Sequence, residues 1–138
     1  MSSLKRPAIS TEVRGRIDTD TLLRLAVTEA FEVKPTSIVH LDLRDLCSFT
    51  DYFLIVSVSS IRQVLAVADR IEARLRDERI RIFHREEDRE ARWILLDYSD
   101  VIIHIFDEEM RLYYDLEGLW ADAPRQELVQ NGSLVPLR

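Results

Sequence analysis

The stretch WILLDYSDVIIHIF, from Trp93 to Phe106, decides the fold of this chain. Two apolar runs of strand length flank a short polar segment, which is the pattern of two antiparallel strands joined by a turn. We expect the turn at Tyr98 and Ser99, although neither residue favours the positive φ of two-residue hairpin turns. The stretch therefore predicts a β-hairpin, and a three-residue loop is the alternative that would change which side chains share a face.

The two faces of this hairpin differ in composition. Cross-strand partners point to the same side of a sheet. One face is purely aliphatic and must pack under helices; its members are Ile94, Leu96, Val101, Ile103 and Ile105. The other face mixes large apolar side chains with charge; its members are Trp93, Leu95, Asp97, Asp100, Ile102, His104 and Phe106. Such a mixture favours a binding surface over a core, and the alternative is that the last helix covers it while the aspartates serve the turn.

The tip of the hairpin is acidic. Asp97 and Asp100 would lie opposite each other in the expected register, where like charges repel by about a few tenths of a kcal/mol. A basic partner would relieve that repulsion. The whole chain carries a formal net charge of -6, which disfavours generic binding to nucleic acid and suits a basic protein partner.

Helices and further strands are expected on both sides of the hairpin. Before it lie a helix that starts at Asp18 or Asp20 and stops before Pro35, strands at 37–42 and 52–57, and a long amphipathic helix opened by Ser60 and Gln63. After it lie a helical segment near 107–114 and the stretch LEGLW at 116–120. A short strand is possible at 81–84, and we interpret the charge run REEDREAR at 85–92 as a solvated loop. The sum is an α/β fold in which a mixed sheet is flanked by helices.

The domain organisation is simple. At 138 residues the chain fits one domain, and no interior Pro/Gly-rich linker divides it. We expect a flexible N-terminal tail at 1–17, one domain at 18–124 and a flexible C-terminal tail at 125–138. Cys47 is the only cysteine and no apolar run reaches the roughly 20 residues of a membrane helix. The expected location is the cytoplasm, with an organellar matrix as the weaker alternative.

The residues that most enzyme mechanisms need are missing from the expected positions. The three glycines, at 15, 118 and 132, do not lie between a strand and a helix, so a phosphate-binding loop is not expected. Asp42, Asp45 and Asp51 could in principle hold a metal, but turn and cap roles suit them better. We expect His40 and His104 to be satisfied within strands and Cys47 to be a packed thiol.

Four motifs in order carry a resemblance to a known family. They are TDYF at 50–53, WILLD at 93–97, VIIHIF at 101–106 and YDLEGLW at 114–120. Together they closely resemble the ribosomal silencing factor family, also called Iojap, over about residues 22–124. The family often has glycine at the positions of Val58 and Ser99 and a basic residue at that of Gly118.

The resemblance implies a fold and a function. The fold would be similar to that of nucleotidyltransferases but without their activity, so neither catalysis nor a cofactor is expected. The family binds ribosomal protein L-fourteen on the large ribosomal subunit and prevents association with the small subunit, which slows translation when nutrients run low. Its members often form homodimers. The acidic net charge of this chain disfavours direct nucleic-acid readout, and its apolar runs are too short for a membrane span.

The resemblance also implies which residues contact the partner. The family's contacts centre on the hairpin, which is the mixed face derived above from spacing alone. The corresponding residues here are Trp93, Leu95, Asp97, Tyr98, Asp100 and His104. Weaker candidates, with a partner or a dimer role, are Tyr52, Phe106, Tyr113 and Trp120.

Three hypotheses follow for the function. The first is a steric block, in which a rigid domain anchored on one subunit occupies the volume that the other must enter. The second is a metal-dependent nucleotidyltransferase that uses Asp42 and its neighbours. The third is a purely structural homodimer whose mixed face is self-complementary.

Overall fold

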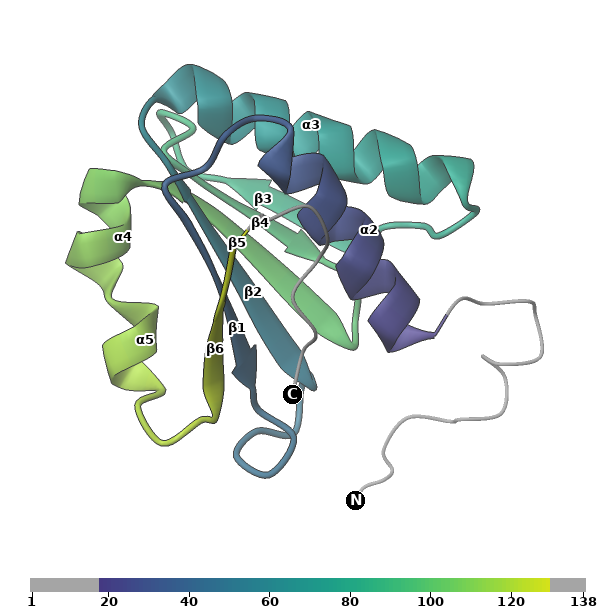
Figure 1. Cartoon of the computed structure of the whole chain (residues 1–138), viewed down its shortest axis with the longest axis vertical. Coiled ribbons are helices and arrows are strands. Elements are labelled where there is room, and N and C mark those ends of the chain that lie inside the picture. Colours follow the sequence, from purple (N-terminus) through teal and green to yellow (C-terminus); the bar gives the residue numbers. More distant parts are fainter. Residues whose placement is uncertain (1–17, 130–138) are drawn as a thin grey trace.

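A mixed six-stranded sheet forms the middle of the molecule, and the computed structural model describes residues 18–129 (Figure 1). The strand order is β3-β4-β5-β2-β1-β6. β2 and β5 are parallel, and the other neighbouring strands are antiparallel. The strands are β1 (Ser37–Asp42), β2 (Tyr52–Val58), β3 (His84–Glu87), β4 (Trp93–Asp97), β5 (Val101–Asp107) and β6 (Arg125–Leu128). This confirms the expected α/β class.

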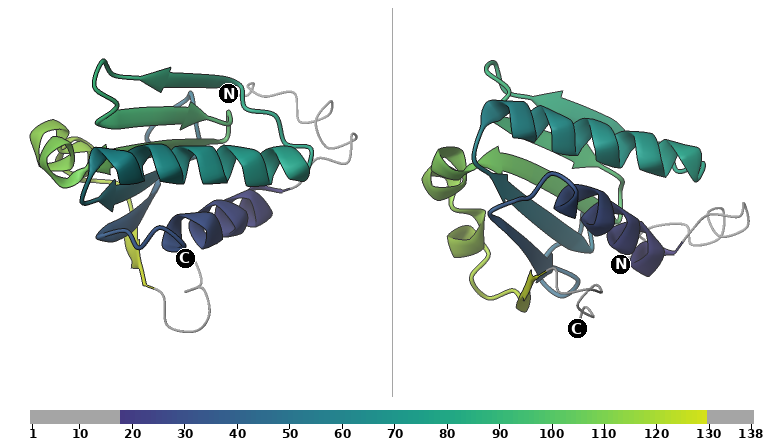
Figure 2. Two further views of the ribbon diagram at one scale, coloured as in Figure 1. Left: turned by 90° about the horizontal axis from the view of Figure 1, so that it is seen from above. Right: turned by 45° about the horizontal axis from the view of Figure 1, so that its top comes forward.

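Two helices, α2 (Thr19–Phe31) and α3 (Ile61–Asp77), cover one face of the sheet side by side, as Figure 2 shows. Both begin where the sequence predicted, because the side chain of Asp18 accepts from the backbone N–H of Thr21 and that of Ser60 from the N–H of Gln63. Below them lies the aliphatic face of the hairpin, with Ile94, Leu96, Val101, Ile103 and Ile105 fully buried. We call this the closed face of the sheet.

Two short helices, α4 (Glu108–Tyr114) and α5 (Leu116–Leu119), pack against the opposite face. Asp107 caps α4 through the N–H of Met110, and Asp115 caps α5 through the N–H of Gly118. Met110 and Leu116 of these helices, and Trp120 directly after α5, contact a second buried cluster that contains Phe53, Ile55, Ile102 and Phe106. α4 packs on β5 and β2, and its Tyr114 also contacts Trp93 at the start of β4. The rest of β4 and the neighbouring β3 are less covered, since Leu95 and Asp97 are half-buried and His84 and Glu86 exposed. We call this side of the sheet the open face.

The hairpin turn lies one residue later than expected. Tyr98 donates its N–H to the carbonyl of Val101 at 2.9 Å, so the two turn residues are Ser99 and Asp100. Ser99 takes the positive φ of 75° that such turns usually assign to glycine. Every cross-strand pair therefore shifts by two positions: Trp93 lies opposite Phe106, and Asp97 opposite Ile102 rather than Asp100. A shift of two keeps the assignment of faces but removes the expected repulsion between the aspartates.

Two segments that were expected to be irregular are strands. β3 lies in the charge run, not at 81–84, because pairing with β4 and ion pairs of its side chains hold that run in the sheet. The expectation of a solvated loop across 85–92 is therefore wrong for residues 85–87. β6 pairs with β1 from Arg125 to Leu128, so the sheet continues past the expected start of the C-terminal tail. The expected tail at 1–17 and the last nine residues of the chain lie outside the described residues.

None of the helices between residues 18 and 129 is both long and apolar enough to cross a membrane.

Candidate protein-docking site

Trp93 is the centre of the candidate site. It starts β4 on the open face and is half-buried. Its indole Nε1 donates a hydrogen bond to Nδ1 of His104 at 3.1 Å. The indole ring also packs at 5.4 Å from the ring centroid of Phe106 and at 4.6 Å from that of Tyr114. One side of the indole is therefore fixed by an aromatic cluster that β5 and α4 supply.

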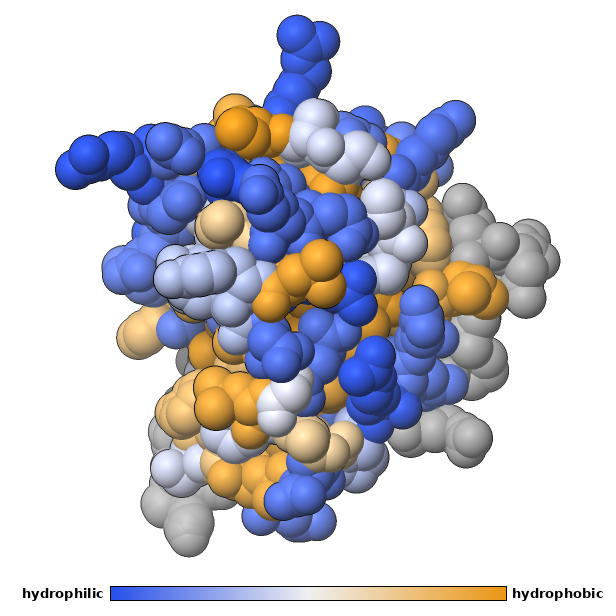
Figure 3. Space-filling view, turned by 90° about the vertical axis from the view of Figure 1, so that its left-hand side faces the viewer, coloured by the Kyte–Doolittle hydropathy of each residue, from blue (hydrophilic) through white to orange (hydrophobic). Residues whose placement is uncertain are grey.

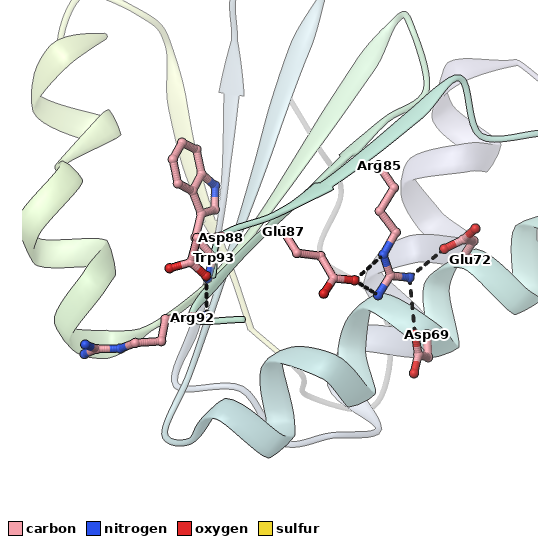
Figure 4. A network of polar contacts seen from close by, with 7 residues as sticks. All are labelled: Asp69, Glu72, Arg85, Glu87, Asp88, Arg92 and Trp93. Carbon is pink, nitrogen blue, oxygen red and sulfur yellow. Dashed lines mark hydrogen bonds and ion pairs between the residues drawn. The ribbon is translucent and has the colours of Figure 1, made fainter. Parts of the chain in front are cut away.

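The main chain of Trp93 is held separately, by Asp88 (Figure 4). One carboxylate oxygen of Asp88 accepts from the N–H groups of Arg92 at 2.7 Å and Trp93 at 3.2 Å. The N–H of Asp88 in turn donates to the carbonyl of Trp93 at 3.0 Å. Asp88 thus closes the turn between β3 and β4 and sets where β4 begins.

Leu95 and Asp97 continue the same face of β4 beyond Trp93. Alternate side chains of a strand share a face and lie roughly 7 Å apart. All three are half-buried, and their neighbours on this face of the edge strand are His84 and Glu86, both exposed. The carboxylate of Asp97 accepts from the N–H of Ser99 at 2.7 Å, so it braces the turn. We call Trp93, Leu95 and Asp97 the docking strip.

Three of the expected contact residues lie beneath the surface, which corrects their assignment. Tyr98 packs on the closed face at 7% exposure, and burial raises the pKa of its hydroxyl. His104 is 4% exposed and Phe106 1%. Their positions follow from the packing of α3 on one face and α4 on the other, which sequence spacing cannot reveal. Side chains buried to this extent offer a partner almost no surface.

The remaining candidates are dispersed around the sheet. Asp100 is half-buried in the turn, and its carbonyl accepts from the N–H groups of Asp51 and Tyr52, which ties the hairpin to β2. Tyr52 is half-buried between the ring of His40 and the guanidinium of Arg44. These residues lie away from Trp93, at the opposite end of β5, since Tyr52 pairs with Val101 and Trp93 with Phe106.

Tyr113 lies on α4, and Trp120 directly follows α5. Tyr113 is 75% exposed on α4. Trp120 is half-buried and meets the ring of Phe53 edge-on at 6.0 Å. Figure 3, which faces the side of α4 and α5, shows apolar patches separated by hydrophilic side chains. The large exposed apolar residues on these helices are Leu112, Tyr113, Tyr114 and Leu119.

A network around Arg85, which sequence reasoning missed, braces the outer edge of the sheet (Figure 4). The guanidinium of Arg85 contacts Glu72 at 2.7 Å and Asp69 at 3.2 Å on α3, and Glu87 at 2.7 Å on its own strand. Arg92 similarly joins the start of β4 to Asp107 at 2.8 Å. The mixed signs within the charge run were the available signal, since opposite charges two residues apart share one face of a strand.

The described residues do not gather a metal site: no group of three or more His, Cys, Asp or Glu side chains is placed to hold an ion between residues 18 and 129. Asp42 instead forms a bidentate contact with Arg44, and the hydrogen bonds from that guanidinium hold the pKa of the Asp42 carboxyl below its usual value. Cys47 is a half-buried free thiol next to the open-face cluster.

Fold and site together define a class: a single α/β domain with a mixed sheet, one face closed by two helices and the other left partly open along β4. The chain belongs to the ribosomal silencing factor family, since the family model "Ribosomal silencing factor during starvation" matches residues 16–135. Proteins named ribosomal silencing factor are similar to it. That of Halalkalibacterium halodurans is 38% identical over 78% of this chain and 92% of its own length. That of Bacillus subtilis is 36% identical over the same shares.

A plant protein and two solved structures are also similar to this chain. A maize protein named Iojap, chloroplastic, is 33% identical over 72% of this chain and 43% of its own length. A crystal structure from Chromobacterium violaceum superposes with a TM-score of 0.72 at 27% identity, covering 87% of this chain and 94% of that one. One from Bacillus halodurans gives 0.69 at 35% identity, covering 80% and 100%. The family and the fold expected from the four motifs are thereby confirmed, while the likeness to nucleotidyltransferases stays a prediction.

Proposed function

We propose that this protein silences ribosomes by binding ribosomal protein L-fourteen on the large subunit and blocking association with the small subunit. Membership of the ribosomal silencing factor family supports the regulatory role. The docking strip carries the proposal for the contact, because it presents an aromatic side chain, an aliphatic one and a carboxylate on one strand, of which α4 contacts only the start, through Tyr114 against Trp93.

The chemistry of the strip suits a basic protein surface. Large aromatic side chains at the centre of an interface supply most of the affinity, while charges beside them set orientation and encounter rate. Trp93 and Leu95 would form the apolar centre. Asp97 would meet a Lys or Arg of the partner without leaving its own hydrogen bond to the N–H of Ser99. The net charge of -6 assists encounter with such a partner.

The proposed action is steric and consumes nothing. A bound domain excludes the small subunit from the volume that it fills, so silencing depends only on how much of the large subunit is occupied. No reaction step and no cofactor enters this mechanism. We propose that the protein acts in the cytoplasm, because silencing of ribosomes, the role that the names of its bacterial relatives give, would take place there.

The test is binding to purified large subunits by sedimentation or interferometry. We expect Trp93→Ala to weaken binding by about 2 kcal/mol or more, which is roughly 30-fold. Ile61→Ala is the matched control, because Ile61 is 40% exposed at the start of α3, on the closed side. Asp97→Asn keeps an oxygen for the N–H of Ser99 while it removes the charge, so we expect a loss of a few-fold and a weaker dependence on salt.

A folded Trp93→Ala variant that co-sediments like the unaltered protein would remove the docking strip from the proposal. A subunit-joining assay tests the steric step separately. Purified small subunits should fail to form whole ribosomes on large subunits saturated with this protein. Joining that proceeds unchanged at full occupancy would leave binding intact but contradict silencing by exclusion.

We also propose that the protein forms a homodimer, which the family resemblance suggests. The exposed side chains of Leu112, Tyr113 and Leu119 offer an apolar surface for it on the outer side of α4 and α5. Sedimentation equilibrium of Leu112→Ser with Leu119→Ser checks this, because the double variant should dissociate at concentrations at which the unaltered protein is dimeric.

A further inference from the structure

The indole of Trp93 has one hydrogen-bond donor, and the structure turns it inward. Nε1 donates to Nδ1 of His104, a side chain that is 4% exposed on β5. Trp93 lies opposite Phe106 in the sheet, and His104 lies opposite Leu95, so this contact runs diagonally between the two strands. The ring of His104 lies nearly parallel to the indole, with 25° between their planes, and meets Phe53 edge-on at 4.5 Å between centroids.

We propose that His104 is a positioning residue that fixes the indole of Trp93 for docking, and that Trp93 consequently offers its partner a ring surface and not a hydrogen-bond donor. The proposal rests on the proposed function, since it concerns the same docking strip. It gives His104 a role in binding although its side chain is not available to a partner.

The protonation state of His104 fits this role. Burial lowers the pKa of its imidazole to about 3, so the ring is neutral near pH 7. A neutral ring that accepts at Nδ1 carries its proton on Nε2. That nitrogen is buried and has no hydrogen-bond partner among residues 18–129. A buried unsatisfied donor destabilises the folded state, whereas an aliphatic side chain at the same place would leave no donor unpaired.

Stability alone therefore does not account for a histidine at position 104. The cluster around it is apolar, with Phe53, Ile55 and Phe106 among its members, and leucine would suit that setting. What leucine lacks is an acceptor for the Trp93 N–H. Asp88 completes the arrangement from the other side, because it holds the main-chain N–H and carbonyl of the same residue (Figure 4).

The arrangement determines what kind of group can meet Trp93. Because the N–H is occupied, an acceptor on the partner gains nothing there, and the remaining ring surface suits aliphatic groups or a cation. Asp97 lies four residues further along the same face, where it favours Lys or Arg as well. We infer that the partner presents a basic side chain whose aliphatic stem covers Trp93 or Leu95.

The test compares two substitutions of similar size. His104→Asn places an amide oxygen near the position of Nδ1 and so keeps an acceptor, whereas His104→Leu removes it. In ¹H–¹⁵N spectra the chain has two indole N–H signals, from Trp93 and Trp120, which Trp120→Phe assigns. We expect the Trp93 signal to move upfield and exchange faster with solvent in His104→Leu, and to stay nearly in place in His104→Asn.

Binding to large subunits is measured on the same proteins. We expect His104→Leu to bind about 10-fold more weakly and His104→Asn to stay within about 3-fold of the unaltered protein, with His104→Leu at least as stable to heat. Asp88→Asn, which keeps the carboxamide oxygen, and Asp88→Ala, which lacks it, form a second pair with the same expected order. That pair tests the main-chain support of Trp93. Should a variant at position 104 fail to fold, Trp93→Phe, which removes the indole N–H itself, keeps the proposal falsifiable: we expect it to bind more weakly than the unaltered protein, and unchanged binding would overturn the proposal.

Three results would overturn the proposal: unchanged binding by His104→Leu, equal losses for Leu and Asn, or an indole signal that does not respond to His104→Leu. A double-mutant cycle with Trp93→Phe adds a further check, because His104→Leu should cost almost nothing when the indole N–H is already gone. The spectra need no ribosome. If the indole signal responds to His104→Leu as expected but Trp93→Ala binds large subunits normally, the hydrogen bond stands and the docking strip is refuted.

Discussion

The two faces of the sheet use the same hairpin in different ways. The closed face is aliphatic along β4 and β5 and is sealed by α2 and α3, so its side chains are fully buried. The open face is built from aromatic, acidic and imidazole side chains, and α4 and α5 cover it over β5, β2 and β1 while they leave most of β4 half-buried. Stability is concentrated on one side of the strand and the candidate docking strip on the other. Neighbouring residues of β4 should therefore respond to mutation in opposite ways.

The sharpest test of this difference uses Leu95 and Leu96, adjacent residues on opposite faces of β4. Leu96→Ala should lower the free energy of unfolding by about 3 kcal/mol, because it leaves a cavity under α3 in a fully buried cluster. Leu95→Ala, at a half-buried site, should cost about 1 kcal/mol. Chemical denaturation gives the first comparison.

Binding to large subunits should give the reverse order. Leu95→Ala should weaken it several-fold, while Leu96→Ala, at a temperature where it is folded, should leave it unchanged. Equal effects of the two substitutions on both measurements would show that the faces do not divide these roles.

The second test measures how the free energy of unfolding depends on pH, which involves a buried histidine on each face of the sheet. The pKa of His104 is lowered to about 3 by burial, and burial lowers that of His40 as well. Their unfolded values lie near 6.5. The unfolded chain therefore binds more protons below pH 6.5, and the free energy of unfolding must fall as the pH drops from about 6.5 towards 3.

Variants separate the contributions to this pH dependence. His104→Asn should flatten the fall in unfolding free energy between pH 6 and 4, as followed by thermal melting. Ile61→Ala is the control, because Ile61 is an exposed residue without a titratable group and should leave the slope unchanged. A slope that Ile61→Ala reduces as much as His104→Asn does would contradict the role of burial.

The smallest expected effect lies at the turn that both faces share. Ser99 has a φ of 75°, which costs an L-residue roughly 1 kcal/mol and costs glycine almost nothing. Ser99→Gly should raise the melting temperature by a few degrees. It should leave large-subunit binding unchanged, because the docking strip ends at Asp97. A destabilised variant would show that the serine side chain matters more than its backbone conformation.

Much of this fold could be predicted from spacing. The caps at Asp18 and Ser60, the bounds of β1 and the two faces of the hairpin follow from local patterns, which depend on hydrogen bonds and side-chain periodicity within a few residues. The assignment of side chains to the two faces was correct although the turn lies one residue later than expected, because the cross-strand register shifted by two residues. The strands β3 and β6 were missed because each is short and charged. β6 gains its stability from pairing with the distant β1, and β3 from pairing with β4 and from the ion pairs of Arg85 with α3.

The candidate site divides in the same manner. Trp93, Leu95 and Asp97 could be found from alternation along one strand. Three features could not be predicted, because each depends on where a separate element packs. They are the burial of Tyr98, the burial of His104 and Phe106 beneath the open-face side chains, and the hydrogen bonds from Asp88 to the main chain of Trp93.

By itself the sequence determined the class of fold, the family, the hairpin and the division of its side chains between two faces, since periodicity and ordered motifs are properties of the chain alone. Only the tertiary structure decided which side chains of the mixed face stay accessible and that His104 supports Trp93 from below. The physical reason is that exposure and hydrogen-bond partners depend on contacts between segments far apart in the chain, and no local pattern contains them.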